Sequence, residues 1–185
     1  MAQTDKQGLR DRMRAERLAY SAVAPPILPP RAFLDRLRPT GVIASYVAMP
    51  GEADPALLAN AAHEWGWQIA LPHITDRASP MRFLAWQPGE PLVAGPFGLH
   101  QPAITAPELK PDIVLTPLLA FDSALNRLGQ GAGYYDRAFH GLEPVLRIGV
   151  AWSIQRVPAL PVDPWDVPLH GIIDEYGWNE PEQTA

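Results

Sequence analysis

The chain has 185 residues, a formal net charge of −5 and no cysteine. This length suits one domain with a sizeable core. The negative charge argues against a polynucleotide partner, because nucleic-acid-binding proteins carry a basic footprint. The lack of cysteine excludes disulfides and thiolate-ligated metals. No apolar run reaches membrane-spanning length, and the polar N-terminus is unlike a secretory signal. We therefore expect a cytoplasmic protein with no membrane partner, and we take a monomer as its expected state.

The first half of the chain predicts helices and strands in alternation. In chain order, the expected elements are a helix at 4–20, a short helix at 32–37, a strand at 41–49, a helix at 53–66, a strand at 67–74 and an edge or hairpin strand at 81–86. The strands at 41–49 and 67–74 are both apolar and flank a helix. Such a unit predicts a parallel pair joined by a right-handed crossover.

The second half continues this pattern and contains the strongest strand signal of the chain. Its expected elements are strands at 111–122, 145–152 and 170–178 and a helix at 134–142. Together, the elements predict an α/β fold: a single three-layer domain, residues 1–185, with a central, mostly parallel sheet flanked by helices.

A glycine-rich loop lies between the strand at 111–122 and the helix at 134–142. Gly129, Gly131 and Gly133 alternate there. Glycine lets the backbone approach a ligand and adopt positive φ. Successive amides and a helix N-terminus then favour an anion. The spacing fits neither a Walker A loop nor the dinucleotide fingerprint, so the loop predicts a phosphate site of another type.

Two charged side chains flank this loop. Arg127 offers a forked donor set suited to phosphate oxygens. Asp136 would repel a bound phosphate unless a divalent cation lay between them, and Mg²⁺ binds through one or two carboxylates plus substrate phosphates. Loop, arginine and aspartate together predict a site for a Mg²⁺–nucleotide. A tight turn with surface charges is the alternative explanation.

The segment NRLGQGAGYYDR (126–137) resembles the signature Arg-Leu-Gly-x-Gly-x-Gly-Tyr-Tyr-Asp of the 5-formyltetrahydrofolate cyclo-ligase family, also called methenyltetrahydrofolate synthetases. Other segments match the family in the same order, and the resemblance covers residues 6 to about 175. They are KQGLR (6–10), SYVAMPGEAD (45–54), ALPHI (70–74), MRFLAW (81–86), FGLHQP (97–102), PDIVLTPLLAFD (111–122) and IGVAWSIQRVPALPVDPWDVPLHGIIDE (148–175).

The resemblance implies an enzyme that uses ATP and Mg²⁺ to convert 5-formyltetrahydrofolate into 5,10-methenyltetrahydrofolate, with release of ADP and phosphate. In this chemistry the γ-phosphoryl group of ATP activates the formyl oxygen, and N10 of the folate then attacks the formyl carbon. Phosphoryl transfer needs alignment and charge neutralisation more than a protein nucleophile. The expected partners are therefore a folate and ATP, both small molecules.

Carried over position by position, the resemblance also implies residue roles. Arg127 and Tyr134 are the implied catalytic side chains, and Tyr134 either contacts the formyl group or stacks on the pterin. Asp136 and Asp166 are the implied Mg²⁺ ligands. The implied ATP contacts are Lys6, Arg10, Arg127, Leu128, Gly129, Gln130, Gly131, Ala132, Gly133, Tyr134 and Tyr135. The implied folate contacts are Val47, Glu52, Met81, Trp86 and Tyr134.

Most of these residues also have a structural explanation. Lys6 and Arg10 suit the solvated face of a terminal helix, and Glu52 suits a cap of the helix near Asp54. Asp166 suits a turn. Tyr134, Tyr135, Met81 and Trp86 suit core packing. In a regular strand Met81 and Trp86 point to opposite faces, which makes Trp86, at the strand end, the weaker candidate.

Four residues depart from the family pattern: Gln101, Gln130, Ala132 and Trp165. We expect the loop to keep its anion-binding shape, because its three glycines remain. Two other functions stay open at this point. One is a different enzyme on a similar α/β scaffold, such as a sugar-phosphate isomerase or a CoA-transferase. The other is a non-catalytic module that binds a nucleotide or a folate.

Overall fold

The structure is a computed structural model that describes residues 2–142 and 144–182, with side chains from Lys6 onward. Its main feature is a seven-stranded sheet. In spatial order the strands are β11 (Gly177–Asn179), β10 (Gly171–Asp174), β9 (Leu146–Val150), β6 (Ile113–Pro117), β1 (Val42–Ala44), β2 (Gln68–His73) and β3 (Arg82–Trp86). The five inner strands run parallel, while β3 and β11 pair antiparallel at the edges. The predicted α/β fold with a mostly parallel sheet is confirmed.

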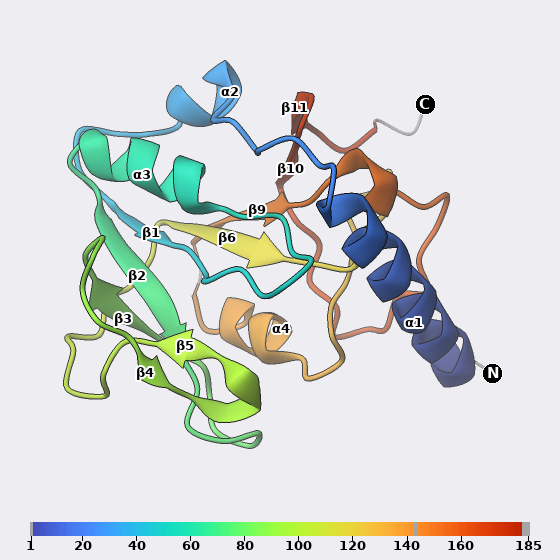
Figure 1. The fold of residues 1–185 in the computed structure, drawn as a ribbon, viewed down its shortest axis with the longest axis horizontal. Helices are drawn as coiled ribbons and strands as arrows, with labels where there is room; N and C mark the ends of the chain where they lie inside the picture. The colour runs from blue at the N-terminus through green and yellow to red at the C-terminus, as the bar shows by residue number, and fades with distance from the viewer. Residues whose placement is uncertain (1, 143, 183–185) are drawn as a thin grey trace.

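Helices cover both faces of this sheet, and two small hairpins extend from it (Figure 1). The helices are α1 (Ala2–Ser21), α2 (Arg31–Leu34), α3 (Ala56–Glu64) and α4 (Tyr134–Phe139), with 3₁₀ turns η1 (Pro96–Gly98) and η2 (Ser153–Gln155). The hairpins pair β4 (Val93–Ala94) with β5 (His100–Gln101), and β7 (Ala120–Phe121) with β8 (Arg127–Leu128). No helix in the described ranges is long and apolar enough to cross a membrane.

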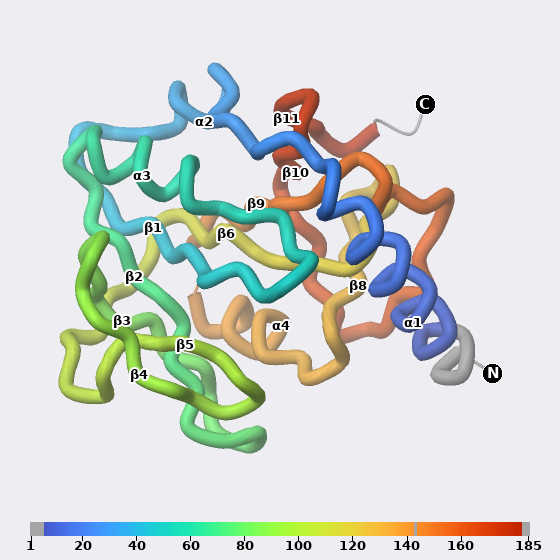
Figure 2. Tube along the Cα trace, in the orientation of Figure 1, coloured from blue at the N-terminus to red at the C-terminus, as the bar shows by residue number. Residues whose placement is uncertain are grey.

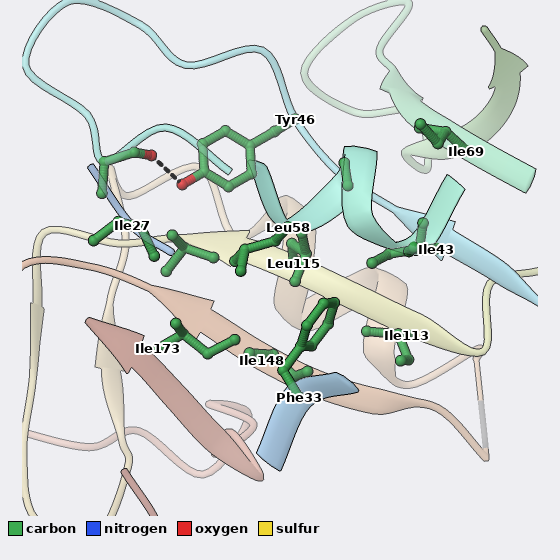
Figure 3. Close-up of a cluster of buried hydrophobic side chains, with 14 of the residues drawn as sticks. Ile27, Phe33, Ile43, Tyr46, Leu58, Ile69, Ile113, Leu115, Ile148 and Ile173 are labelled. Atoms are coloured by element: carbon green, nitrogen blue, oxygen red, sulfur yellow. Dashed lines mark hydrogen bonds between the residues drawn. The ribbon is translucent and has the colours of Figure 1, made fainter. Parts of the chain in front are cut away.

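Two apolar layers pack against opposite faces of the sheet. Successive strand residues point to opposite faces, so Ile43 joins the layer under α2 and α3 while Ala44 joins the layer under α4. Figure 3 shows the first layer, in which Phe33 of α2 and Leu58 of α3 meet the strand residues. Small Ala44 on the other face leaves room for α4 to approach the sheet.

The strand order reverses between β1 and β6. In chain order the parallel strands β1 and β2 lie on one side, and β6, β9 and β10 follow on the other. In open α/β sheets, ligands bind at such a switch point, beyond the carboxyl ends of the strands. Helix α1 lies at this end of β6 (Figure 1), where Arg17 donates to the carbonyl of Leu118, 3.0 Å away. The fold thus brings the first helix to the edge where a ligand is expected.

Several predicted elements differ from the observed ones. The strand at 41–49 ends at Ala44 because the chain turns away, and Tyr46 then donates to the carbonyl of Ala53 at 2.6 Å (Figure 3). The strand at 111–122 is split into β6 and β7. The strand at 170–178 is in fact the hairpin of β10 and β11, whose turn is held by Asp174 accepting from the amides of Tyr176 and Gly177. The two small hairpins were not predicted.

Candidate active site

Helix α1 turns a basic face toward the rest of the molecule. Lys6 and Arg17 are buried, and Arg10 is half-buried. Residues three or four apart share one helix face, so these cations line up along one side of α1. Met13 lies on the same side and packs with Leu128, which anchors the helix through an apolar contact. The alternative explanation of Lys6 and Arg10 as a solvated helix face is therefore wrong, because both side chains reach other loops.

Two arginines of α1 hold the glycine loop. Arg10 Nε donates to the carbonyl oxygen of Gly129 at 3.1 Å, and Arg14 donates to the side chain of Gln130 at 3.0 Å. Figure 2 shows the chain leaving β8 beside α1 and continuing to α4. Gly131 and Gly133 have φ of 101° and 67°, a conformation that favours glycine. The loop is thus shaped by its glycines and fixed by two cations.

The structure differs from the sequence-based picture of this loop in two respects. The β7–β8 hairpin separates the loop from strand β6, so the loop does not directly follow a strand of the seven-stranded sheet. Helix α4 spans six residues, and its N-terminus adds little to anion binding at that length. The side chain of Leu128 is buried in the core, and its carbonyl accepts from the amide of Leu119 at 2.7 Å, so neither group is left for a nucleotide.

Arg127 and Asp136 form an ion pair beneath the loop. Arg127 Nη2 lies 2.8 Å from Asp136 Oδ1, and the two side chains are 5% and 18% exposed. The same oxygen accepts from the amide of Val167 at 3.1 Å, which brings the segment of Asp166 next to Asp136. Arg127 Nε is buried and has no hydrogen-bond partner within the described chain. The guanidinium therefore retains a donor that is not satisfied by these protein groups.

Lys6 binds two aspartates far along the chain. Its Nζ lies 2.6 Å from Asp163 Oδ2 and 2.8 Å from Asp166 Oδ2. Asp163 was not predicted as a site residue, and no local sequence pattern indicates it. Asp166 Oδ1 and Asp136 Oδ2 have no hydrogen-bond partner among the described residues. Each predicted metal ligand thus keeps one carboxylate oxygen for a cation.

Both predicted Mg²⁺ ligands suit a site that is completed by phosphate. Among the described residues, no group of three or more His, Cys, Asp or Glu side chains is arranged to hold a metal. Mg²⁺ commonly takes one or two carboxylates and completes its shell with substrate phosphates and water. The free oxygens of Asp136 and Asp166 beside the glycine loop fit that usage.

Glu52 lies in the loop after β1 and is enclosed by charged and phenolic groups. Arg17 Nη1 is 3.5 Å from Glu52 Oε1, and the amide of Met49 donates to Oε2 at 3.1 Å. Burial and the negative charge of Glu52 raise the pKa of Tyr135, while Arg127 opposes this effect. Burial and Glu52 also hold the pKa of Tyr46 well above its usual value. Both phenols therefore stay protonated and can donate hydrogen bonds.

The other predicted folate contacts divide between the two sheet faces. Met81 and Tyr134 belong to one buried cluster on the α4 face, and the Tyr134 hydroxyl donates to the carbonyl of Asp76 at 3.1 Å. Trp86 packs against the cluster on the opposite face, and its indole nitrogen donates to the carbonyl of Glu90 at 3.0 Å. Val47 is exposed on the loop after β1. The structure brings Met81 and Tyr134 together and leaves Trp86 apart from them.

A groove of about 470 Å³ opens beside Glu52. It lies between the end of α1, the proline-rich segment after it and the start of α3. Its lining consists of Ser21, Ala24, Pro25, Pro26, Ile27, Gly51, Glu52, Asp54, Leu57 and Trp152. Of the predicted folate contacts in the described chain, Glu52 is the one that lines this groove, whereas Met81 and Tyr134 lie in the buried cluster on the α4 face.

The residues that depart from the family pattern have visible contacts in three of four cases. Gln101 is buried, and its amide bonds the backbone N–H and carbonyl of Ile74 at 3.0 and 3.1 Å. Gln130 binds Arg14, as described above. The carbonyl of Ala132 accepts from Arg137 at 2.8 Å. Trp165 is 62% exposed, and nothing in the structure explains it.

Comparison with known proteins identifies a family. The profile of the 5-formyltetrahydrofolate cyclo-ligase family matches residues 2–175. A 5-formyltetrahydrofolate cyclo-ligase of Haemophilus influenzae is 33% identical over 138 residues, which are 71% of this chain and 74% of that protein. One from Escherichia coli is 31% identical over 138 residues, or 71% and 76% of the two chains.

Solved structures with this fold carry the related name of 5,10-methenyltetrahydrofolate synthetase. One from Aquifex aeolicus superposes with a TM-score of 0.73 at 23% identity, covering 97% of this chain and 94% of that one. One from Mycoplasma pneumoniae has a TM-score of 0.68 at 22% identity, covering 92% and 99%. At these identities the likeness shows the fold. With the profile match and the relatives above 30% identity, it follows that the chain belongs to the 5-formyltetrahydrofolate cyclo-ligase family.

Proposed function

We propose that the chain catalyses the ATP- and Mg²⁺-dependent cyclisation of 5-formyltetrahydrofolate to 5,10-methenyltetrahydrofolate, with release of ADP and phosphate. The observation that carries the proposal is the convergence of cations on one glycine loop. Arg10 and Arg14 reach the loop from α1, and Arg127 lies buried at its start. Cations around exposed loop amides suit the phosphates of ATP.

The reaction takes place in two steps on this arrangement. The formyl oxygen attacks the γ-phosphorus of ATP, a P–O bond forms, and the bond to the leaving ADP breaks. N10 of the folate then attacks the activated formyl carbon, loses its proton, and the C–O bond breaks to release phosphate. Charge shifts between phosphate oxygens in both steps, so fixed donors such as Arg127 favour the transition state over the ground state.

The predicted residues other than Val47 and Trp86 have roles in this scheme. Asp136 and Asp166 would hold Mg²⁺, which supplies charge neutralisation on the phosphates when bound. Lys6 and Arg10 neutralise nucleotide charge from α1, and residues 127–135 surround the phosphates. Glu52 accepts from the N–H edge of the pterin, while Met81 and Tyr134 contact the folate from the α4 face. A cytoplasmic monomer remains the predicted state of the enzyme.

The assay that tests the proposal follows product and nucleotide together. Purified protein with 5-formyltetrahydrofolate, Mg²⁺ and ATP is expected to generate the absorbance of the methenyl product and one ADP for each product molecule. Omission of ATP or of Mg²⁺ is the matched control and should abolish both signals. Nucleotide binding without any product would contradict the proposal and favour a binding module. The match over residues 2–175 supports the cyclo-ligase over a sugar-phosphate isomerase or a CoA-transferase.

A further inference from the structure

Arg17 is a buried cation that the proposed reaction has not used so far. Its side chain is 5% exposed, and its counterion Glu52 is 6% exposed. Arg17 Nη1 donates both to Glu52 Oε1 at 3.5 Å and to the carbonyl of Leu118 at 3.0 Å. Leu118 directly follows β6, and Glu52 follows β1, so one guanidinium joins the two loops at the switch point of the sheet.

A third loop is tied to the same carbonyl. Gln155 Nε2 in η2, which follows β9, donates to the carbonyl of Leu118 at 2.7 Å, and its side-chain oxygen accepts from the amide of Trp152 at 2.8 Å. The loops after β1, β6 and β9 therefore meet through Arg17 and Gln155. If Arg17 moved, the Leu118 carbonyl would still accept from Gln155, whereas Glu52 would lose its contact with Arg17. Glu52 is therefore the group that depends most on the position of Arg17.

Stability alone is a poor explanation for this pair. Removing two charges from water costs more than their attraction returns in many buried pairs, and an apolar pair of similar volume often stabilises as well. Burial lowers the pKa of Arg17, which Glu52 opposes, so the pair is held against a real cost. Arg17 Nε is also buried without a hydrogen-bond partner in the described chain. Because the guanidinium leaves one buried donor without a partner, its presence is better explained by its effect on the position of Glu52.

The geometry leaves Glu52 free for a ligand. A carboxylate has about four acceptor sites. Arg17 uses one on Oε1, and the amide of Met49 uses one on Oε2. A nitrogen–oxygen distance of 3.5 Å is long for an ionic hydrogen bond, so Arg17 acts on Glu52 more through its charge than through a short bond. The two contacts orient the carboxylate, while its remaining acceptor sites stay available.

We propose that Arg17 is the positioning residue of folate recognition: it orients the Glu52 carboxylate so that this group accepts from the pterin edge. This inference rests on the proposed role of Glu52. Arg17 then contributes to the affinity for the folate. By contrast, Lys6, Arg10 and Arg14 on the same helix lie on the nucleotide side of the proposed site.

A double-mutant cycle tests the inference. The variants are Arg17→Met, Glu52→Gln and the double variant, with Arg12→Met as control because Arg12 lies exposed on α1 beside Glu16. Arg17→Met is expected to raise the KM for 5-formyltetrahydrofolate roughly tenfold, with the KM for ATP changed less than about twofold. The double variant should match Glu52→Gln alone, because Arg17 acts through Glu52. Arg17→Lys should restore part of the affinity, since it keeps the charge.

The outcomes separate the inference from the function it rests on. If Glu52→Gln leaves the folate KM unchanged, the role of Glu52 and with it the inference are wrong. If Glu52→Gln raises that KM while Arg17→Met does not, the inference alone is wrong. Arg17 would have a purely structural role if the fold-changes in folate KM of the two single variants multiplied in the double variant. The same conclusion would follow if Arg17→Met raised the KM for ATP as much as the KM for the folate. If Arg17→Met does not fold, Arg17→Lys and the double variant, which leaves no uncompensated charge, decide the same question.

Discussion

Arg127 and Asp136 are bound to each other at 2.8 Å, although the proposed reaction needs one for phosphate and the other for Mg²⁺. The pair explains how a carboxylate can lie beside the proposed phosphate site: the guanidinium neutralises its charge. Asp136 also accepts from the amide of Val167, so it fixes the segment of Asp166. One side chain thus links the nucleotide loop to the second predicted metal ligand.

We expect Asp136→Asn to lower kcat at least about a hundredfold, because fixed charge at a phosphoryl transfer site has effects of this size. The variant should also need more Mg²⁺ for half-maximal activity, which a titration of activity against Mg²⁺ measures. Asp35→Asn is the control, since Asp35 pairs with Arg31 on the surface. A wild-type kcat and Mg²⁺ requirement in Asp136→Asn would refute the metal assignment.

Gly131→Ala should weaken ATP binding as well as stability. Gly131 has a φ of 101°, and an added Cβ would lie 3.4 Å from Arg10 Cζ. Gly89 has a similar φ of 93° but open space around it, so Gly89→Ala carries the backbone strain without the contact. Each variant should lose about 1–2 kcal/mol of stability, seen in thermal unfolding. Only Gly131→Ala should raise the KM for ATP. An equal rise in Gly89→Ala would contradict a specific role of the glycine loop in ATP binding.

Met81 and Trp86 offer a contrast between the two sheet faces. Met81 lies with Tyr134, whereas Trp86 packs on the opposite face and donates to Glu90. We expect Met81→Ala to raise the KM for the folate, and Trp86→Ala to leave it unchanged. Met81→Ala should also cost about 2–5 kcal/mol in unfolding free energy through the cavity it creates. The placement of Met81 would be refuted by a folate KM that responds to Trp86→Ala and not to Met81→Ala.

Glu175 makes part of the stability depend on acid pH. Partial burial raises the pKa of Glu175, but hydrogen bonds from the Ser153 hydroxyl and amide and from the Tyr20 hydroxyl outweigh this, so the pKa lies below 4.5. A carboxyl whose pKa is lower in the folded state stabilises the fold at pH values above its unfolded-state pKa. This contribution to stability is lost as the pH falls through the folded-state pKa. The difference in Tm between wild type and Glu175→Gln should therefore be constant above about pH 5 and shrink below 4.5.

Thermal unfolding at a series of pH values checks this linkage. The control is Glu90→Gln, because Glu90 is exposed. A Tm difference for Glu175→Gln that stays constant down to the acid end of the series would contradict the assigned hydrogen bonds. Since Tyr20 belongs to α1 and Ser153 to η2, the measurement also reports how firmly the first helix is docked.

The sequence predicted the parts of the fold that local patterns encode. The strand–helix–strand unit of β1, α3 and β2 follows from two short apolar runs on either side of a helix that ends at a glycine, and it is confirmed as a parallel pair. The hairpin of β10 and β11 was missed because its turn relies on Asp174, which looks like any other polar residue in the segment. The division of 111–122 into β6 and β7 was not predicted, because the residues on both sides of the division are apolar.

The sequence indicated those candidate site residues that lie in a local motif. It did not indicate residues whose role depends on a contact with a distant part of the chain. The glycine loop and Asp136 are local, and sequence indicated both. Arg17 and Asp163 contact residues 35 and 157 positions away. Arg17 lies four residues after Met13, on the helix face that packs inward, whereas Arg12 and Arg14 lie on other sides of α1. The helical spacing indicates this face, but only the structure shows that Arg17 contacts Glu52.

The docking of α1 sets the order in which the enzyme can become active during its synthesis. Helix α1 is made before every strand of the sheet, yet Lys6 binds Asp163, which is made 157 residues later. A growing chain can pair β1, β2 and β6 before that point, but its first helix still lacks the carboxylates that hold Lys6. The proposed nucleotide site should therefore be complete only after Asp163 has been made, and a chain cut before Asp163 should bind ATP more weakly than the whole chain.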